Sequence, residues 1–160
     1  MKVKNFIIAV ICALGGYAGG AKKYQKIVSE ETKRKQKMTD YFELMNVWME
    51  LLEDHKEVAK YFEKNNMKRI AIYGVGKIGE HLFKQLQNSN IEILYFIDKR
   101  AVAFGHGVEV LSLEDKLEKV DAVVVTPVYD YNAISSDLKK KCDYKIVSIE
   151  DVIYETYEEL

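Results

Sequence analysis

Three glycines follow a short apolar run in the middle of the sequence, at a spacing that suits phosphate binding. The run at residues 69–73 leads into Gly74, Gly76 and Gly79, which match the pattern G-x-G-x-x-G. In that pattern the first glycine makes a tight turn, the second lets the backbone approach a pyrophosphate, and the third lets a helix pack on a strand. The stretch therefore predicts a strand, a phosphate-binding loop and a helix.

The next apolar run ends in an acidic residue. Residues 92–97 read as a buried strand, and Asp98 follows directly. An acidic side chain about 20 residues beyond the glycine pattern accepts hydrogen bonds from ribose hydroxyls. Lys99 and Arg100 add positive charge that could meet a 2′-phosphate or the diphosphate of a nucleotide-sugar. The expected cofactor is therefore NAD or NADP, and a nucleotide-sugar stays open as an alternative ligand.

Further candidate ligand contacts come from the start of the helix and from a later strand. Backbone N–H groups at a helix N-terminus stabilise an anion. Lys77 is unfavourable at such a terminus, and a bound anion would reverse that effect. Thr126 and Pro127 end a strand at the edge where ligands bind in open α/β sheets. The expected cofactor-binding residues are Gly74, Val75, Gly76, Lys77, Ile78, Gly79, Asp98, Lys99, Arg100, Thr126 and Pro127.

No catalytic constellation accompanies the loop. Two pairs match the Tyr-x-x-x-Lys dyad of short-chain reductases, namely Tyr73 with Lys77 and Tyr95 with Lys99. Both begin in expected strands, where this spacing does not bring the two side chains together. His106 is a lone histidine in a glycine-flanked loop, which is more typical of a surface residue. We therefore expect a binding site with no catalytic residues and no metal ligands.

Five apolar runs alternate with helical patterns from residue 69 onward. We expect strands at 69–73, 92–97, 108–111, 121–126 and 144–149, and helices at 77–87, from Ser112, at 130–141 and at 151–157. A β-branched run such as 121–126 is typical of parallel strands buried on both faces. The alternation predicts an α/β fold with a compact, five-stranded, parallel Rossmann-like sheet.

A helical segment is expected before the first strand. Residues 22–37 are polar and rich in lysine, which favours a solvated stalk. From Met38 to Leu52 apolar residues recur in steps of three and four, which predicts one apolar stripe that must be buried. The nucleotide-binding domain, a second copy of the chain or another protein could cover it. We expect a membrane anchor or signal segment at residues 1–22, a helical stalk and lead-in at 23–66 and a Rossmann-like nucleotide-binding domain at 67–160. The N-terminal helices are a candidate contact of a homo-oligomer.

Residues 5–21 carry no charge and permit three interpretations. These are a secretory signal peptide, a retained membrane anchor and a buried core helix. At about 1.5 Å per residue the segment reaches roughly 25 Å, against a hydrocarbon core of about 30 Å. More lysines follow the segment than precede it, which places the C-terminal side in the cytoplasm. We expect a single membrane span through residues 5–21 and a location at the cytoplasmic face, the alternative being a soluble cytoplasmic protein.

The overall charge excludes one class of partner. Lysine and arginine number 24 against 25 aspartates and glutamates, for a formal net charge of -1. A nucleic-acid surface needs a clear excess or stripe of basic residues. The expected partner is a small-molecule nucleotide and no nucleic acid.

Residues 70–98, with the loop and strand at 105–110 and the strand at 121–126, resemble a family of small bacterial Rossmann-like domains that bind NAD(P) or nucleotide-sugars. These are similar to the N-terminal domain of sugar acyltransferases and to domains of surface-polysaccharide biosynthesis proteins. The resemblance implies an accessory or sensing component of bacterial surface-polysaccharide metabolism, and the span expected through residues 5–21, which is not part of the resemblance, would tether this cytoplasmic module to the membrane. Two alternatives stay open: an NAD(P)-dependent nucleotide-sugar reductase or epimerase, and a helix-mediated interaction protein with a vestigial nucleotide loop.

Overall fold

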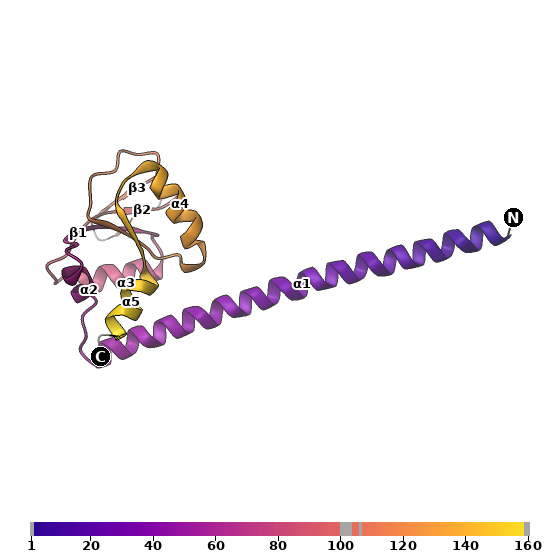
Figure 1. The fold of residues 1–160 in the computed structure, drawn as a ribbon, viewed down its shortest axis with the longest axis horizontal. Coiled ribbons are helices and arrows are strands. Elements are labelled where there is room, and N and C mark those ends of the chain that lie inside the picture. Colours follow the sequence, from indigo (N-terminus) through magenta and orange to yellow (C-terminus); the bar gives the residue numbers. More distant parts are fainter. Residues whose placement is uncertain (1, 100–103, 106, 159–160) are drawn as a thin grey trace. The chain divides into compact units, whose positions relative to one another are not determined.

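The computed structural model describes residues 2–99, 104–105 and 107–158 (Figure 1). The chain divides into two compact units, Met1–Glu43 and Leu44–Leu160. Helix α1 (Lys2–Glu53) forms the described part of the first unit, and its last residues belong to the second. Every strand of the described residues lies in the second unit, which also carries the glycine loop.

A five-stranded parallel sheet forms the centre of the second unit. Its strands are β1 (Arg69–Tyr73), β2 (Glu92–Ile97), β3 (Glu109–Leu111), β4 (Ala122–Val125) and β5 (Lys145–Ser148). They lie in the order β3-β2-β1-β4-β5, and every neighbouring pair is parallel. The prediction of a five-stranded parallel α/β sheet is therefore confirmed. The chain reverses its direction of travel across the sheet between β1 and β4, which makes their carboxyl ends the edge where such folds bind ligands.

Helices cover both faces of this sheet. They are α2 (Ala59–Lys64), α3 (Lys77–Leu86), the short 3-10 helix η1 (Val128–Asp130), α4 (Tyr131–Lys141) and α5 (Ile149–Glu158). In β1, Ile70 and Ile72 join one core cluster with α2, α3, α5 and the end of α1, whereas Ala71 and Tyr73 join a second cluster with α4. This division follows from the two-residue alternation of a strand. Every β1 residue after Arg69 is buried, so the loop that follows starts from a fixed point.

The expectation that the apolar stripe of residues 38–52 is buried as one face is wrong: Trp48 of that stripe is buried, whereas Met38, Phe42, Met49 and Leu52 are at least 50% exposed. Leu44, Trp48 and Leu51 are buried in the core of the second unit. Met49 and Leu52, in the same helical turns, are 56% and 50% exposed. A helix packed on a sheet buries only one face, roughly 100° wide. Met38, Phe42, Met49 and Leu52 therefore stay largely exposed in the single chain.

The expected membrane span through residues 5–21 is wrong. Among the residues that the structure describes, no helix is both long and apolar enough to cross a membrane. A span needs about 20 predominantly apolar residues. The uncharged run is shorter, contains four glycines and is continued by a lysine-rich stretch of the same helix.

The expected helix from Ser112 does not form, although its capping hydrogen bonds do. The backbone N–H of Ser112 donates to Asp115 Oδ2 at 2.7 Å, and that of Glu114 donates to Ser112 Oγ at 3.2 Å. Hydrogen bonds from the backbone and the side chain of Ser112 hold the pKa of Asp115 below its usual value. The connection must cross three strand spacings, about 14 Å, and also return along the sheet. A helix advances only about 1.5 Å per residue, too little for a short connection to cross this distance. Residues 113–115 instead form a turn and a bend, and residues 116–120 have no regular secondary structure.

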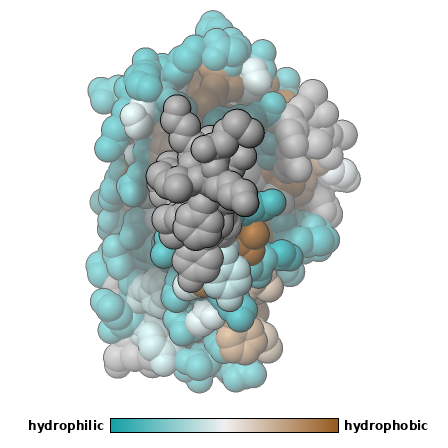
Figure 2. All heavy atoms as spheres, turned by 90° about the vertical axis from the view of Figure 1, so that its right-hand side faces the viewer, coloured by the Kyte–Doolittle hydropathy of each residue, from teal (hydrophilic) through white to brown (hydrophobic). Residues whose placement is uncertain are grey.

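On the face seen in Figure 2, most of the side chains that are coloured by hydropathy are hydrophilic. At the amino edge of the sheet, Asp121 Oδ2 accepts the backbone N–H groups of Lys68 and Arg69, each at 2.8 Å. The bond from Arg69 is the main reason that the pKa of Asp121 lies below its usual value. These bonds fix the starts of β1 and β4 side by side, which aligns their carboxyl ends as well.

Candidate functional site

Two of the three glycines in the loop after β1 are required by the fold itself. Gly74 has a φ of 107°, and a Cβ there would come within 2.6 Å of Thr126 Oγ1. A Cβ on Gly79 would collide with the carbonyl oxygen of Gly74. Both positions therefore need glycine whether or not a ligand binds.

Gly76 has no such structural requirement. Its φ and ψ are -113° and -177°, an extended conformation that any residue can adopt. A Cβ added there would meet nothing within 4 Å. The space in front of Gly76 is open at the position where the glycine pattern expects a pyrophosphate to approach the backbone.

The N-terminus of α3 opens into the same space. The helix begins at Lys77, and its N-cap Gly76 makes no side-chain capping bond. The first N–H groups of any α-helix lack intrahelical acceptors and carry a partial positive charge. Val75 and Ile78 pack their side chains against the core cluster, and the backbone N–H of Val75 already donates to Asp98, so Val75 does not supply a donor for an anion. The arrangement is suited to holding an anion with backbone N–H groups.

Lys77 points its charge at a neighbouring carboxylate. Its Nζ lies 3.1 Å from Glu80 Oε2, and Lys84 Nζ lies 2.7 Å from Glu80 Oε1. Hydrogen bonds from Lys84 and Lys77 lower the pKa of Glu80 to about 2. The Lys77 side chain is 86% exposed. A phosphate contact would require it to leave Glu80 and turn toward the loop.

Asp98 connects the end of β2 to the glycine loop. It is 9% exposed, and its Oδ2 accepts the backbone N–H of Val75 at 2.9 Å. Its own backbone N–H donates to the carbonyl of Leu111 at 3.0 Å, which extends the pairing of β2 with β3. Burial, and next the charge of Asp98, raises the pKa of Tyr73 above its ordinary value. The structure thus places the predicted acidic residue beside the predicted phosphate loop.

Thr126 and Pro127 shape the loop from the side of β4. Thr126 is 4% exposed, and its Oγ1 donates to the carbonyl of Tyr73 at 2.9 Å, with the carbonyl of Gly74 at 3.5 Å. The Pro127 ring lies 3.2 Å from the position of a Cβ on Gly74. Both residues therefore support the loop, and the hydroxyl of Thr126 does so through its hydrogen bond to the carbonyl of Tyr73.

Replacing Thr126 by valine should lower the free energy of unfolding by about 1 kcal/mol, because a buried hydrogen bond is lost at nearly constant volume. Thr156→Val is the matched control. Its hydroxyl donates only to the carbonyl of Val152 in its own helix, at 2.6 Å, a bond that contributes little to stability. Urea unfolding of both variants measures the difference. Equal losses would contradict the assigned role of Thr126.

A pocket of about 280 Å³ lies at this edge of the sheet. It is lined by Tyr73, Gly74, Asp98, Lys99, Pro127, Asp130, Ala133 and Ile134. Four expected site residues meet here, contributed by the ends of three strands. The sequence did not indicate the contributions of η1 and α4, although Asp130 lies only three residues after Pro127, which had been expected at the edge of β4. Arg100 and His106 lie outside the described residues.

A second pocket, of about 420 Å³, shares Lys99 with the first. Its other lining residues are Ser112, Leu113, Glu114, Asp137, Lys140 and Lys141. Two ion pairs cross-link its wall: Lys140 with Asp137 at 3.0 Å and Lys141 with Glu114 at 2.9 Å. The Lys140 ammonium also holds the pKa of Asp137 below its usual value. The open edge thus extends beyond the glycine loop along α4.

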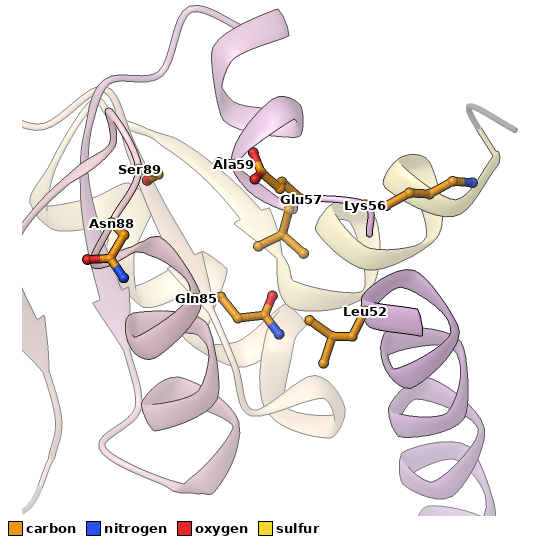
Figure 3. Close-up of a pocket in the computed structure, with 8 residues that line it drawn as sticks. Leu52, Lys56, Glu57, Ala59, Gln85, Asn88 and Ser89 are labelled. Atoms are coloured by element: carbon orange, nitrogen blue, oxygen red, sulfur yellow. The ribbon is translucent and has the colours of Figure 1, made fainter. Parts of the chain in front are cut away.

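A smaller pocket, of about 160 Å³, lies at the other end of α3 (Figure 3). The side chain of Gln85 points toward Leu52 of α1 in this view, whereas Lys56 points away toward α5. The Nζ of Lys56 lies 5.9 Å from the ring centroid of Tyr157. Because α3 starts at the glycine loop, its last turn is remote from that loop. This pocket shares no residue with the ligand edge.

Comparison with protein families agrees with this geometry. The model of the D-isomer specific 2-hydroxyacid dehydrogenase NAD-binding domain matches residues 30–132, which include the glycine loop, Asp98 and the end of β4. Among curated proteins, no sequence matches the chain. The Rossmann-like, NAD-binding part of the expectation is confirmed, while the resemblance to sugar acyltransferase domains stays a prediction. Since the match covers well over half of its length, the chain belongs to the family of NAD-binding domains of D-isomer specific 2-hydroxyacid dehydrogenases.

Proposed function

We propose that this chain binds NAD(H) at the carboxyl edge of β1, β2 and β4, with the pyrophosphate over Gly76 and a ribose against Asp98. The observation that carries the proposal is the contrast among the glycines. Gly74 and Gly79 fill requirements of the fold, whereas Gly76 leaves open space beside an uncapped helix N-terminus. A ligand that brings phosphate against the backbone explains a glycine at this position.

The charges at the edge favour NAD over NADP. The Asp98 carboxylate can accept hydrogen bonds from ribose hydroxyls, and it would repel a 2′-phosphate. Lys99 borders the same pocket and offers a compensating charge. A nucleotide-sugar would share the diphosphate contact but would lack the second nucleoside. A role in bacterial surface-polysaccharide metabolism is compatible with either ligand and stays a prediction.

Calorimetric titration of the full chain with NADH, NADPH and a UDP-sugar tests the proposal. NADH should bind at least tenfold more tightly than NADPH, a difference of about 1.4 kcal/mol. Asp98→Asn should reduce this preference, because it removes the charge that repels the 2′-phosphate. No heat of binding with NADH up to about 1 mM, or tighter binding of the UDP-sugar, would contradict the proposal.

A further inference from the structure

Helix α1 exposes a line of large apolar side chains within the first unit. Tyr24, Met38 and Phe42 are each about two-thirds exposed, at 70%, 67% and 67%, and Val28 is 45% exposed. Together with Glu31 and Lys35 they occupy successive steps of four, three, four, three and four residues. This is the heptad spacing of side chains that meet along a partner helix. We call the six residues the 24–42 stripe.

The described part of the first unit offers nothing to cover this stripe. Every residue from 23 to 39 is exposed there, and residues 40 and 41 are half-buried. Isolated helices are only marginally stable in water. In proteins, most of the stability of a helix comes from packing its apolar face against a partner. A second helix along the stripe would supply that packing. The remaining question is which helix fits.

Two charged residues at the centre of the 24–42 stripe indicate which helix fits against it. Glu31 and Lys35 stand at the two middle positions, where a polar residue sets the orientation of paired helices. In a parallel pair of identical chains, each of these charges would face its own copy. In an antiparallel pair centred at residue 33, Glu31 faces the partner's Lys35 and Lys35 faces the partner's Glu31. Only the antiparallel arrangement is self-complementary, as a two-fold interface requires.

We propose that residues 24–42 pair with the same segment of a second copy of this chain as an antiparallel helical pair. Centring at residue 33 also sets Tyr24 against the partner's Phe42 and Val28 against the partner's Met38. A contact of this kind would run about 27 Å along the helix. Two apolar layers then flank the charged layers on each side. The proposal is independent of NAD binding, because no residue of the ligand edge takes part.

Charge exchange in the full chain tests both the pairing and its direction. Sedimentation equilibrium should show a dimer for the unaltered chain. Glu31→Lys and Lys35→Glu should each weaken dimerisation at least tenfold, because every contact between the middle positions becomes one of like charge. The double variant Glu31→Lys/Lys35→Glu should restore it. Lys33→Glu, on the opposite side of the helix and with the same change in charge as Lys35→Glu, should leave the dimer intact.

Other outcomes overturn the proposal. A monomeric unaltered chain at about 100 µM, a dimer insensitive to both single changes, or a double variant no better than the singles would each do so. A parallel pair would produce the last two results, since exchanging the charges leaves each residue facing its own copy. Phe42→Ser provides a second measurement, because it removes an exposed ring without touching the core of the chain. It should weaken the dimer while circular dichroism shows an unchanged helix content.

Discussion

Replacing Gly76 by aspartate should weaken NADH binding at least about 100-fold, which is close to 3 kcal/mol, without unfolding the protein. The new carboxylate would stand in the open space in front of the loop, where the pyrophosphate is proposed to lie. The backbone at Gly76 already has an extended conformation that aspartate can adopt. Aspartate is also a favoured N-cap residue, so α3 should be unchanged or slightly more stable. Titration calorimetry and urea unfolding measure the two effects separately.

Asn88→Asp is the matched control for the charge. It adds the same negative charge beyond the C-terminal end of α3, at the small pocket of Figure 3. NADH affinity should stay within about twofold of the unaltered chain, since exposed charges farther apart than a Debye length of about 8 Å are screened. If Gly76→Asp retained full affinity, the pyrophosphate could not lie over this part of the backbone.

Replacing Gly79 by alanine should lower the free energy of unfolding by at least about 2 kcal/mol. The added methyl group would collide with the carbonyl oxygen of Gly74, which belongs to the backbone and cannot rotate away. Helix α3 would have to move away from Gly74, and the added methyl group would also lie 3.4 Å from the Phe96 ring. The higher helix propensity of alanine, worth about 1 kcal/mol, offsets only part of this loss. Urea unfolding followed by circular dichroism gives the value.

Gly76→Ala makes the same chemical change three residues earlier. Nothing lies within 4 Å of its added methyl group, so stability should stay within about 0.5 kcal/mol of the unaltered chain. The pair therefore separates a glycine needed for packing from one needed for access. Equal stability of the two variants would show that Gly79 does not approach the carbonyl oxygen of Gly74 as closely as described.

Local patterns predicted the fold well where one segment determines its own structure. The apolar runs, the glycine spacing and the acidic residue after the second strand depend on neighbours in the sequence, and the sheet follows from their alternation. The helix expected from Ser112 failed because its form depends on a distance to be crossed. That distance is set by β3 lying at the sheet edge and β4 beside β1, which only the strand order reveals.

The candidate site was predictable in part for the same reason. Gly74 and Asp98 belong to a motif that can be recognised in the sequence. The place of Asp130 in the pocket depends instead on the path of the chain through η1 after β4. The sequence also suggested Thr126 as a ligand contact, yet its hydroxyl bonds to the carbonyl of Tyr73. Side-chain hydrogen bonds between distant segments leave no periodic signal, so a role in support and a role in binding look alike in a single sequence.

The hydrogen bond from Val75 to Asp98 has a consequence for the rate at which a ligand could bind. Together with the bond from Thr126 to Tyr73, it orders the loop in the free protein. A loop that is already ordered loses little conformational entropy when a ligand arrives, and such preorganisation raises affinity without new contacts. Association then needs no prior rearrangement of the loop. Encounter by diffusion and orientation of the dinucleotide, rather than closure of the protein around it, would set the speed of binding.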